Sequence, residues 1–211
     1  MDSTDSSIDL AEQLAACVRT LAEAGYCPAT GGNFSIRVDA DSLWMTASGV
    51  DKRRLTTSDL IRMGVDGQAR GYGKPSAETA LHLWLYQHRP DTGCVLHVHS
   101  RANTVVSRCA GRGVRFQGYE MQKAVRGQPD HESPLTLPIV ENSQKMADIC
   151  RELESIRANK LPFGFLVRGH GLYAWGQDLA EARRHLEGWE FLLECHLAEL
   201  SLAGNGSEKD L

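Results

Sequence analysis

Apolar residues recur every three or four positions between Ile8 and Ala24, and the same spacing returns between Leu179 and Leu202. This periodicity is typical of a helix that turns one face toward a core. Gly25 ends the first of these stretches, because glycine readily adopts the backbone conformation that follows a helix. The pattern therefore predicts long helices over 8–24 and 179–202.

Shorter helices are expected at three further places. Ser76 can cap a helix over 77–88, which stops before Pro90 and carries Glu78 in its first turn, where the helix dipole favours an anion. Residues 101–110 and 143–157 are also predicted to be helical.

Stretches rich in β-branched and aromatic residues predict the strands. Residues 30–38 and 42–49 form two of them, joined by a polar turn, which indicates a hairpin. Residues 94–100 are a further strand, and 164–176 contain two strands around His170. Because hairpins are interspersed with helices, the sequence predicts a layered α/β domain with a mostly antiparallel sheet.

The composition fits one globular domain over residues 1–211, with polar ends at 1–7 and 204–211 that we expect to be flexible. A formal net charge of −4 argues against a nucleic-acid partner, which would need a basic face to neutralise phosphates. No apolar run approaches the roughly 20 residues that cross a bilayer, and the acidic, polar start is unlike a signal peptide. We therefore expect a cytoplasmic protein without a nucleic-acid or membrane partner.

Two common kinds of site find no support in the sequence. The six cysteines stand singly, without the C-x-x-C pairs of zinc ribbons and redox sites, so each is expected to be a small core residue without a chemical role. No G-x-G-x-x-G follows a strand and no Walker sequence is present, which argues against a nucleotide site.

The segment CVLHVHS carries the first candidate chemistry. Successive side chains of a strand point to opposite faces, so His97 and His99 lie on the same face, about 6.5 to 7 Å apart along the chain. Their imidazoles can converge on one cation, and zinc in catalytic sites commonly takes three protein ligands and keeps one position open. Two alternating histidines fit a solvated strand face, or a satisfied pair beside the core, equally well.

A third histidine changes that balance. His170 stands between two glycines, where small neighbours allow a tight turn and close approach to a ligand, although a turn histidine without a role has the same surroundings. Four other histidines lie on predicted helices beside charged residues, and we expect them at the solvated surface; they are His82, His88, His185 and His196. His131, in a loop, is ambiguous.

Six motifs occur in a familiar order. They are G-G-N-F-S at 31–35, T-A-S-G at 46–49, K-P-S-A-E-T at 74–79, H-V-H-S at 97–100, Y-E-M-Q-K at 119–123 and G-H-G-L-Y-A-W-G at 169–176. In this order they resemble the class II aldolase/adducin superfamily over residues 10–190. Within it, the resemblance is greatest to the dehydratases of methionine salvage that act on methylthioribulose 1-phosphate.

The resemblance implies a fold and a cofactor. The fold is a three-layer α/β/α sandwich around a central, mainly antiparallel sheet, and the assembly is a homotetramer with active sites at the subunit borders. The cofactor is Zn²⁺, held by His97, His99 and His170.

A substrate phosphate site is also implied by the resemblance. Its residues would be Gly32, Asn33, Ser48, Gly49 and Ser76. Glycine-rich turns and a helix N-terminus offer N–H groups to an anion, which agrees with this assignment. Lys74 would add a counter-charge, unless it is a solvated lysine. Ala77 replaces a second serine of the aldolase motif and removes one hydroxyl donor.

Two glutamates compete for the acid/base role. Glu78 has the position of the aldolase glutamate, whereas Glu120 matches the glutamate of the dehydratases and is favoured; without chemistry it would be a carboxylate at a helix start. The expected reaction removes a proton beside the C2 ketone of 5-methylthioribulose 1-phosphate while zinc polarises the ketone. Loss of the C4 hydroxyl then gives 2,3-diketo-5-methylthiopentyl 1-phosphate.

Two other functions stay open at this stage. One is a zinc aldolase or 4-epimerase acting on another phosphorylated ketose, which the Ser76-Ala77-Glu78 segment favours. The other is a non-catalytic interaction domain like the adducin head, which lacks the complete histidine triad. The methylthio end needs an apolar pocket, but Phe34, Met121 and Trp175 are expected in the core rather than against a ligand.

Overall fold

The computed structural model describes residues 3–71, 73–156 and 160–206. The helices, strands and short 3-10 helices (η) are, in chain order, α1 (Ser3–Glu23), β1 (Asn33–Arg37), β2 (Ser42–Thr46), η1 (Lys52–Arg54), η2 (Thr57–Asp59), β3 (Leu60–Gly64), α2 (Thr79–His88), β4 (Cys94–Val98), α3 (Arg101–Cys109), β5 (Gly113–Phe116), η3 (Glu120–Ala124), β6 (Leu135–Val140), α4 (Met146–Ile156), β7 (Gly164–Val167), β8 (Gly171–Gly176) and α5 (Leu179–Gly206).

The strands of the described residues form one sheet in the order β3-β2-β1-β4-β8-β7-β6-β5. Every pairing in it is antiparallel except that of β6 with β7. The predicted antiparallel character is confirmed, and so is the hairpin of β1 and β2. The register sets Asn33 opposite His97, and His97 opposite Tyr173, so three side chains with polar atoms meet near the middle of the sheet.

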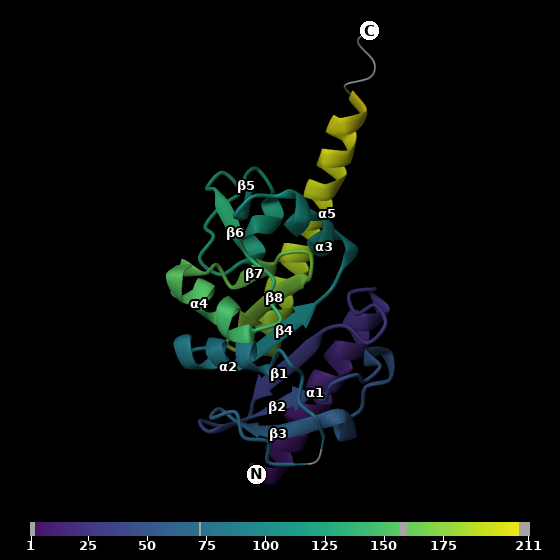
Figure 1. The fold of residues 1–211 in the computed structure, drawn as a ribbon, viewed down its shortest axis with the longest axis vertical. Helices are drawn as coiled ribbons and strands as arrows, with labels where there is room; N and C mark the ends of the chain where they lie inside the picture. Colours follow the sequence, from purple (N-terminus) through teal and green to yellow (C-terminus); the bar gives the residue numbers. More distant parts are fainter. Residues whose placement is uncertain (1–2, 72, 157–159, 207–211) are drawn as a thin grey trace.

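Helices cover both faces of this sheet, which confirms the predicted α/β/α layers. Figure 1 shows α2 and α4 on one side of the strands and α1 and α3 on the other, with α5 crossing behind β8 and β4. The C-terminal part of α5 projects beyond the end of the sheet. No helix among the described residues is long and apolar enough to cross a membrane.

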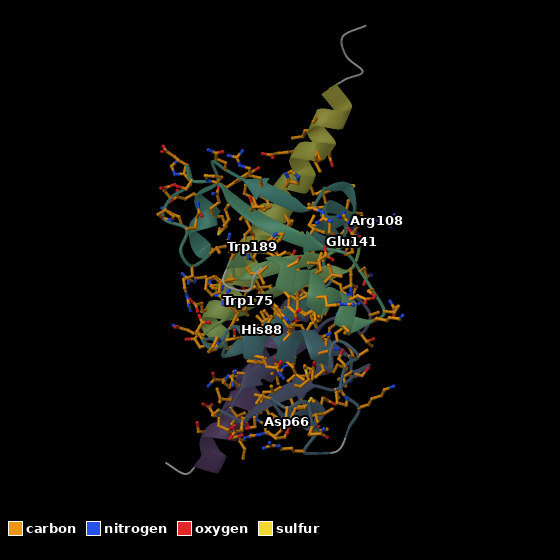
Figure 2. All side chains as sticks on the ribbon, turned by 60° about the vertical axis from the view of Figure 1, so that its left-hand side comes forward. Asp66, His88, Arg108, Glu141, Trp175 and Trp189 are labelled. Atoms are coloured by element: carbon orange, nitrogen blue, oxygen red, sulfur yellow. The ribbon has the colours of Figure 1, made fainter. Side chains whose placement is uncertain are left out.

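A single buried cluster of apolar side chains fills the space between these layers. Trp175 and Trp189 lie inside the body of the molecule, and both are fully buried (Figure 2). Phe34 is buried as well, in agreement with the expectation for Phe34 and Trp175, whereas Met121 is 38% exposed and does not belong to the core.

The prediction that the cysteines are buried core residues is correct for only three of the six. Cys17, Cys27 and Cys94 are buried, but Cys109 is exposed and the others are half-buried.

The expectation that four helical histidines face solvent is wrong for two of them. His82 and His185 are fully buried, because each lies on the helix face that packs toward the sheet and each has partners there. His82 is hydrogen-bonded to Ser35, and His185 to the main-chain carbonyl of Trp175. His88 is exposed, and His196 is half-buried.

Helix ends differ from the predicted ones. Helix α1 begins at Ser3, and α2 begins at Thr79 with Glu78 in the N-cap position, so Ser76 does not cap it. The carbonyl of Ser76 accepts hydrogen bonds from the main-chain N and the hydroxyl of Thr79, which makes a separate turn ahead of the helix. Of the ends predicted to be flexible, residues 1–2 and 207–211 lie outside the described residues; 3–7 and 204–206 belong to helices.

Candidate active site

Strand β4 carries His97, and His99 follows directly after its last residue. His97 is fully buried, and its Nε2 lies 2.8 Å from Nε2 of His99. The Nδ1 of His97 lies 3.0 Å from the carbonyl oxygen of Leu172. Because a carbonyl only accepts, this Nδ1 carries the proton and Nε2 is left with a lone pair that faces His99. Such an arrangement suits two ligands of one cation.

The loop between β7 and β8 brings the third histidine to them. The His170 ring lies 5.1 Å from the ring of His97 and 4.6 Å from that of His99, between centroids. Helix α3 holds the loop: Gly169 N donates to Ser107 Oγ at 2.9 Å, and Thr104 Oγ1 donates to the His170 carbonyl at 3.3 Å. The same helix also contacts the end of the strand that carries His97, because Asn103 Nδ2 donates to the carbonyl of Val98 at 3.3 Å.

A carboxylate completes the cluster. Glu78 Oε1 lies 3.0 Å from His170 Nε2, and Glu78 Oε2 lies 3.2 Å from His97 Nε2. One ligand atom from each of Glu78, His97, His99 and His170 lies within 4.8 Å of all the others. Tyr173 supports two members, because its hydroxyl donates to Glu78 Oε2 at 2.9 Å and its ring stacks on His97 at 3.9 Å.

The electrostatics of the cluster favour a cation. Burial, and then the neighbouring His97 and His170, lower the pKa of His99 to about 3, and burial also lowers the pKa of His97. Burial would raise the pKa of Glu78, but its interactions with His170 and His97 outweigh burial and hold that pKa below its usual value. His97 and His99 are therefore neutral and Glu78 is charged near pH 7, which is the state that binds zinc without releasing protons.

Two glycines leave the space that the imidazoles occupy. A Cβ on Gly171 would lie 2.7 Å from Cε1 of His97 and 2.9 Å from Cδ2 of His99, and a Cβ on Gly31 would lie 2.9 Å from Nδ1 of His99. A methyl group at either position would displace a ring. The donor set and its packing thus fit a divalent metal ion.

A cavity of about 270 Å³ opens beside His99 and Glu78. It is lined by residues 30–33, 47–49, 52, 76–78 and 99. All five residues of the implied phosphate site line it: Gly32, Asn33, Ser48, Gly49 and Ser76. The structure therefore brings the implied phosphate residues next to the histidine cluster, although they come from three separate segments.

The two lysines near this cavity differ from expectation. Lys74 is exposed and does not line the cavity; only its carbonyl takes part, accepting from Ser48 N at 2.9 Å. Lys52 lines the cavity and is 1% exposed, with Nζ donating to the carbonyls of Thr30 at 2.8 Å and Val50 at 2.9 Å. No pattern in the sequence pointed to it, because Lys52-Arg53-Arg54 is typical of a solvated charge run.

The second candidate glutamate lies elsewhere in the chain. Glu120 begins η3, and its side chain is 70% exposed. It pairs with Lys123 and, at 3.5 Å, with Nδ1 of His131. The hydrogen bond from Lys123 lowers the pKa of Glu120. Within one chain, the structure brings Glu78 but not Glu120 into the histidine cluster.

Known proteins with similar sequences match this chain over most of its length. The chain is 47% identical over 197 residues to a methylthioribulose-1-phosphate dehydratase of Xanthomonas campestris pv. campestris (strain 8004), covering 92% of this chain and 91% of that one. It is 46% identical over 199 residues to the protein of that name from Stenotrophomonas maltophilia (strain R551-3), covering 93% of each.

Solved structures share the fold at lower identity. An L-fuculose-1-phosphate aldolase from Thermus thermophilus superposes with a TM-score of 0.73 at 24% identity, covering 93% of this chain and 96% of that one. Residues 12–197 match the family described as Class II Aldolase and Adducin N-terminal domain. The chain belongs to the class II aldolase and adducin family.

Proposed function

We propose that this protein is a zinc-dependent hydro-lyase that converts 5-methylthioribulose 1-phosphate to 2,3-diketo-5-methylthiopentyl 1-phosphate in cytoplasmic methionine salvage. The observation that carries the proposal is the meeting of His97, His99, His170 and Glu78 beside a cavity lined by Ser48 and Ser76. The relatives described above, which match more than nine-tenths of the chain, bear the name of this activity.

The reaction needs a base beside a polarised ketone. A carboxylate takes the proton from C3, negative charge develops on the C2 oxygen, and the C4 hydroxyl leaves with a proton as water. The C3–C4 enol that remains then becomes the C3 ketone. A divalent cation held by the three imidazoles supplies positive charge next to the C2 oxygen.

Two carboxylates share the acid/base work in this proposal. Glu78 is proposed to perform the proton transfer closest to the metal. Asn33 Nδ2 at 2.7 Å and the Tyr173 hydroxyl at 2.9 Å hold its Oε2 in place. Glu120 is exposed on η3, and its proposed place of action is the site of a neighbouring subunit. This role for Glu120 requires a homotetramer with sites at the subunit borders, and we propose that assembly of single-domain chains.

The phosphate of the substrate is proposed to bind in the cavity beside Glu78. Gly32, Asn33, Ser48, Gly49 and Ser76 supply main-chain and side-chain donors there, and Gly49, at φ +76°, has no atom within 4 Å of the Cβ position. Lys52 supplies positive charge at the edge of this cavity. Lys74 is not needed in this arrangement.

The deciding experiment is turnover by the zinc-loaded protein. Incubation with 5-methylthioribulose 1-phosphate should yield the diketone with loss of one water, detected by mass spectrometry. Replacement of Glu78 or Glu120 by Gln should each lower kcat by about 10²- to 10⁴-fold, the usual contribution of general acid/base catalysis. No turnover by the wild-type protein would reject the proposal.

The same assay distinguishes the alternatives. Release of dihydroxyacetone phosphate or glycolaldehyde phosphate from other phosphorylated ketoses would instead indicate an aldolase, and inversion at C4 of such a ketose an epimerase. A purified protein that neither contains nor binds zinc would indicate an interaction domain.

A further inference from the structure

A chain of hydrogen bonds runs behind the candidate site, through side chains that contact neither the proposed metal nor the cavity, and ends on Asn33. Tyr86 and His82 lie on α2, four residues apart, and Ser35 lies on β1 opposite them. Tyr86 OH is 2.8 Å from Ser35 Oγ, which is 2.7 Å from His82 Nδ1. His82 Nε2 is 2.5 Å from Asn33 Oδ1. All four side chains are buried.

The donors and acceptors determine the direction of each of these hydrogen bonds. Oε2 of the Glu78 carboxylate accepts from the Tyr173 hydroxyl and faces Asn33 as an acceptor, so the Asn33 atom that faces it is the donor Nδ2, and Oδ1 faces His82. Since Oδ1 only accepts, His82 donates from Nε2. Burial, and then the charge of His97, lower the pKa of His82 to about 3, so the ring carries this single proton. Its Nδ1 therefore accepts from Ser35, and Ser35 accepts from Tyr86.

We propose that His82, supported by Ser35 and Tyr86, is a positioning residue that holds the Asn33 amide in the one orientation that directs its N–H groups at Glu78 and Ser76. The inference rests on the proposed metal site.

Both targets of the amide belong to the site. Asn33 Nδ2 lies 2.7 Å from Glu78 Oε2 and 3.3 Å from Ser76 Oγ. Without the His82 donor, a flipped amide would set its oxygen against the Glu78 carboxylate, and two acceptors at that distance repel. His82 thus acts on the carboxylate of the metal cluster through one intervening residue, as partners of metal ligands commonly do.

The tautomer of His82 is the first test. Nitrogen-15 NMR of the intact protein, with His82 assigned from the spectrum of His82→Gln, should show a neutral ring protonated at Nε2 from pH 5 to pH 8. A ring protonated at Nδ1, or one that becomes charged in this range, would overturn the proposal. This measurement is made on the wild-type protein and needs no substrate.

Metal affinity is the second test, measured by competition with a chromophoric chelator and by the visible spectrum of the Co²⁺ form. His82→Leu removes the donor to Asn33 and should lower metal affinity about 10- to 100-fold. His82→Gln keeps an N–H donor and should restore affinity to within about threefold. An unchanged affinity in folded His82→Leu would contradict the positioning role.

His185 offers a matched control, because it is also fully buried and its two ring nitrogens are paired, with the Trp175 carbonyl and with Arg126 N. His185→Leu should lose thermal stability but keep metal affinity within about threefold. Equal losses of affinity in His185→Leu and His82→Leu would mean that only general packing is involved, and would reject the proposal. Failure of dehydratase turnover alone, with these results intact, would reject the proposed function but not the role of His82.

Discussion

The ammonium group of Lys52 has been removed from water without a carboxylate to pair with among the described residues. Its two partners are main-chain carbonyls, and a buried charge of this kind is costly unless an anion joins it. Lys52→Met should therefore raise KM for the phosphorylated substrate roughly 10- to 100-fold, because a hydrogen bond to a charged group is worth about 1.5–3 kcal/mol. The kcat should change much less.

Steady-state kinetics and competitive inhibition by inorganic phosphate measure this effect. The affinity for inorganic phosphate should fall in parallel with the rise in KM. Lys74→Met is the comparison, since Lys74 is exposed and outside the cavity lining, and its KM should change less than about threefold. A larger effect from Lys74 than from Lys52 would return the counter-charge to Lys74. Thermal melts identify any loss of stability from the carbonyls that Lys52→Met leaves unpaired.

The same two lysines show why single residues are the hardest part to predict. Sequence spacing suggested His97, His99 and His170 as candidates, because alternation along a strand and a glycine-flanked turn restrict where a side chain points, and the family resemblance assigned them to a metal. Nothing comparable separates a buried Lys52 from an exposed Lys74. Burial of His82 was missed for the same reason, since its neighbours in sequence are not its neighbours in space.

Gly171, the first residue of β8, packs against the end of β4 where the rings of His97 and His99 leave no space for a side chain. Gly171→Ala would drive a Cβ against the carbonyl oxygen of Val98 and bring it to 2.7 Å from the ring of His97 and 2.9 Å from that of His99. The rings must shift, so zinc affinity should fall by about 10- to 100-fold, with a comparable loss of activity. Titration calorimetry or chelator competition measures this change.

Gly176→Ala is the matched control at the other end of β8. Its Cβ would lie 2.5 Å from the main-chain N of Ala182, so it also strains the backbone, but it touches no metal-site residue. It should lower thermal stability and leave zinc affinity within about threefold. If both variants lose zinc equally, the effect belongs to the strand and not to the ring packing.

Helices α3 and α5 are joined through a buried carboxyl group. Glu190 on α5 is fully buried and accepts from Ser100 Oγ at 2.6 Å and from Asn103 Nδ2 at 2.8 Å. Burial raises its pKa from 4.5 to about 7, despite the lowering effect of those hydrogen bonds. Between pH 4.5 and 7 the folded protein keeps a proton on Glu190 that the unfolded chain releases. The stability that the protonated carboxyl group contributes is therefore lost as pH rises through that range.

Glu190→Gln removes the titration while keeping the shape. Between about pH 4.5 and about pH 8 the wild type should lose on the order of 3 kcal/mol more unfolding free energy than Glu190→Gln, as expected for a shift of this size. Urea unfolding of both proteins across this range measures the difference. Parallel pH profiles would show that the pKa of Glu190 is not raised in the folded protein.

Elements were predictable where their pattern is long. The helices α1 and α5 and the central strands β1, β4 and β8 follow from periodicity and from runs of buried apolar residues. Three outer strands carried no clear pattern: β3, β5 and β6. β5 has only four residues, which are too few for an alternating pattern to be recognised, and Pro138 interrupts the pattern of β6. The two strands pair with each other, and this pairing is not visible in either segment alone.

At the scale of the whole molecule, the order of the strands is what the sequence pattern alone does not determine. Periodicity predicted an antiparallel α/β domain, and the resemblance supplied the layers, but neither contained the register that sets Asn33 opposite His97 and His97 opposite Tyr173. That register sets Asn33 beside His97, and Glu78 from the start of α2, His99 after β4 and His170 from the loop between β7 and β8 complete the site. Long-range pairing of this kind is decided by packing across the sheet and not by local preference.

Several exposed apolar side chains lie on or near α5. Phe191, Leu200 and Leu202 are between 45% and 72% exposed. The C-terminal part of α5 projects beyond the sheet (Figure 1). Phe191 also lines, with Met121, a cavity of about 860 Å³ between α1, η3 and α5. Surfaces of this kind favour contact with other copies of the chain, which supports the proposed homotetramer.

An assembly with sites at its subunit borders makes a sharp prediction, because Glu120 and the histidine cluster would then work in trans. Glu120→Gln and His99→Ala should each be nearly inactive alone. Co-assembled in equal amounts, they should regain about a quarter of wild-type activity, since random mixing pairs an intact cluster with an intact neighbouring Glu120 at about one border in four. Mixed tetramers, purified through two different affinity tags, would be assayed for the diketone. If such tetramers form and remain inactive, both groups must act within one chain, and the site at the subunit border is rejected. If Glu120→Gln alone keeps wild-type activity, Glu78 is the acid/base residue by itself.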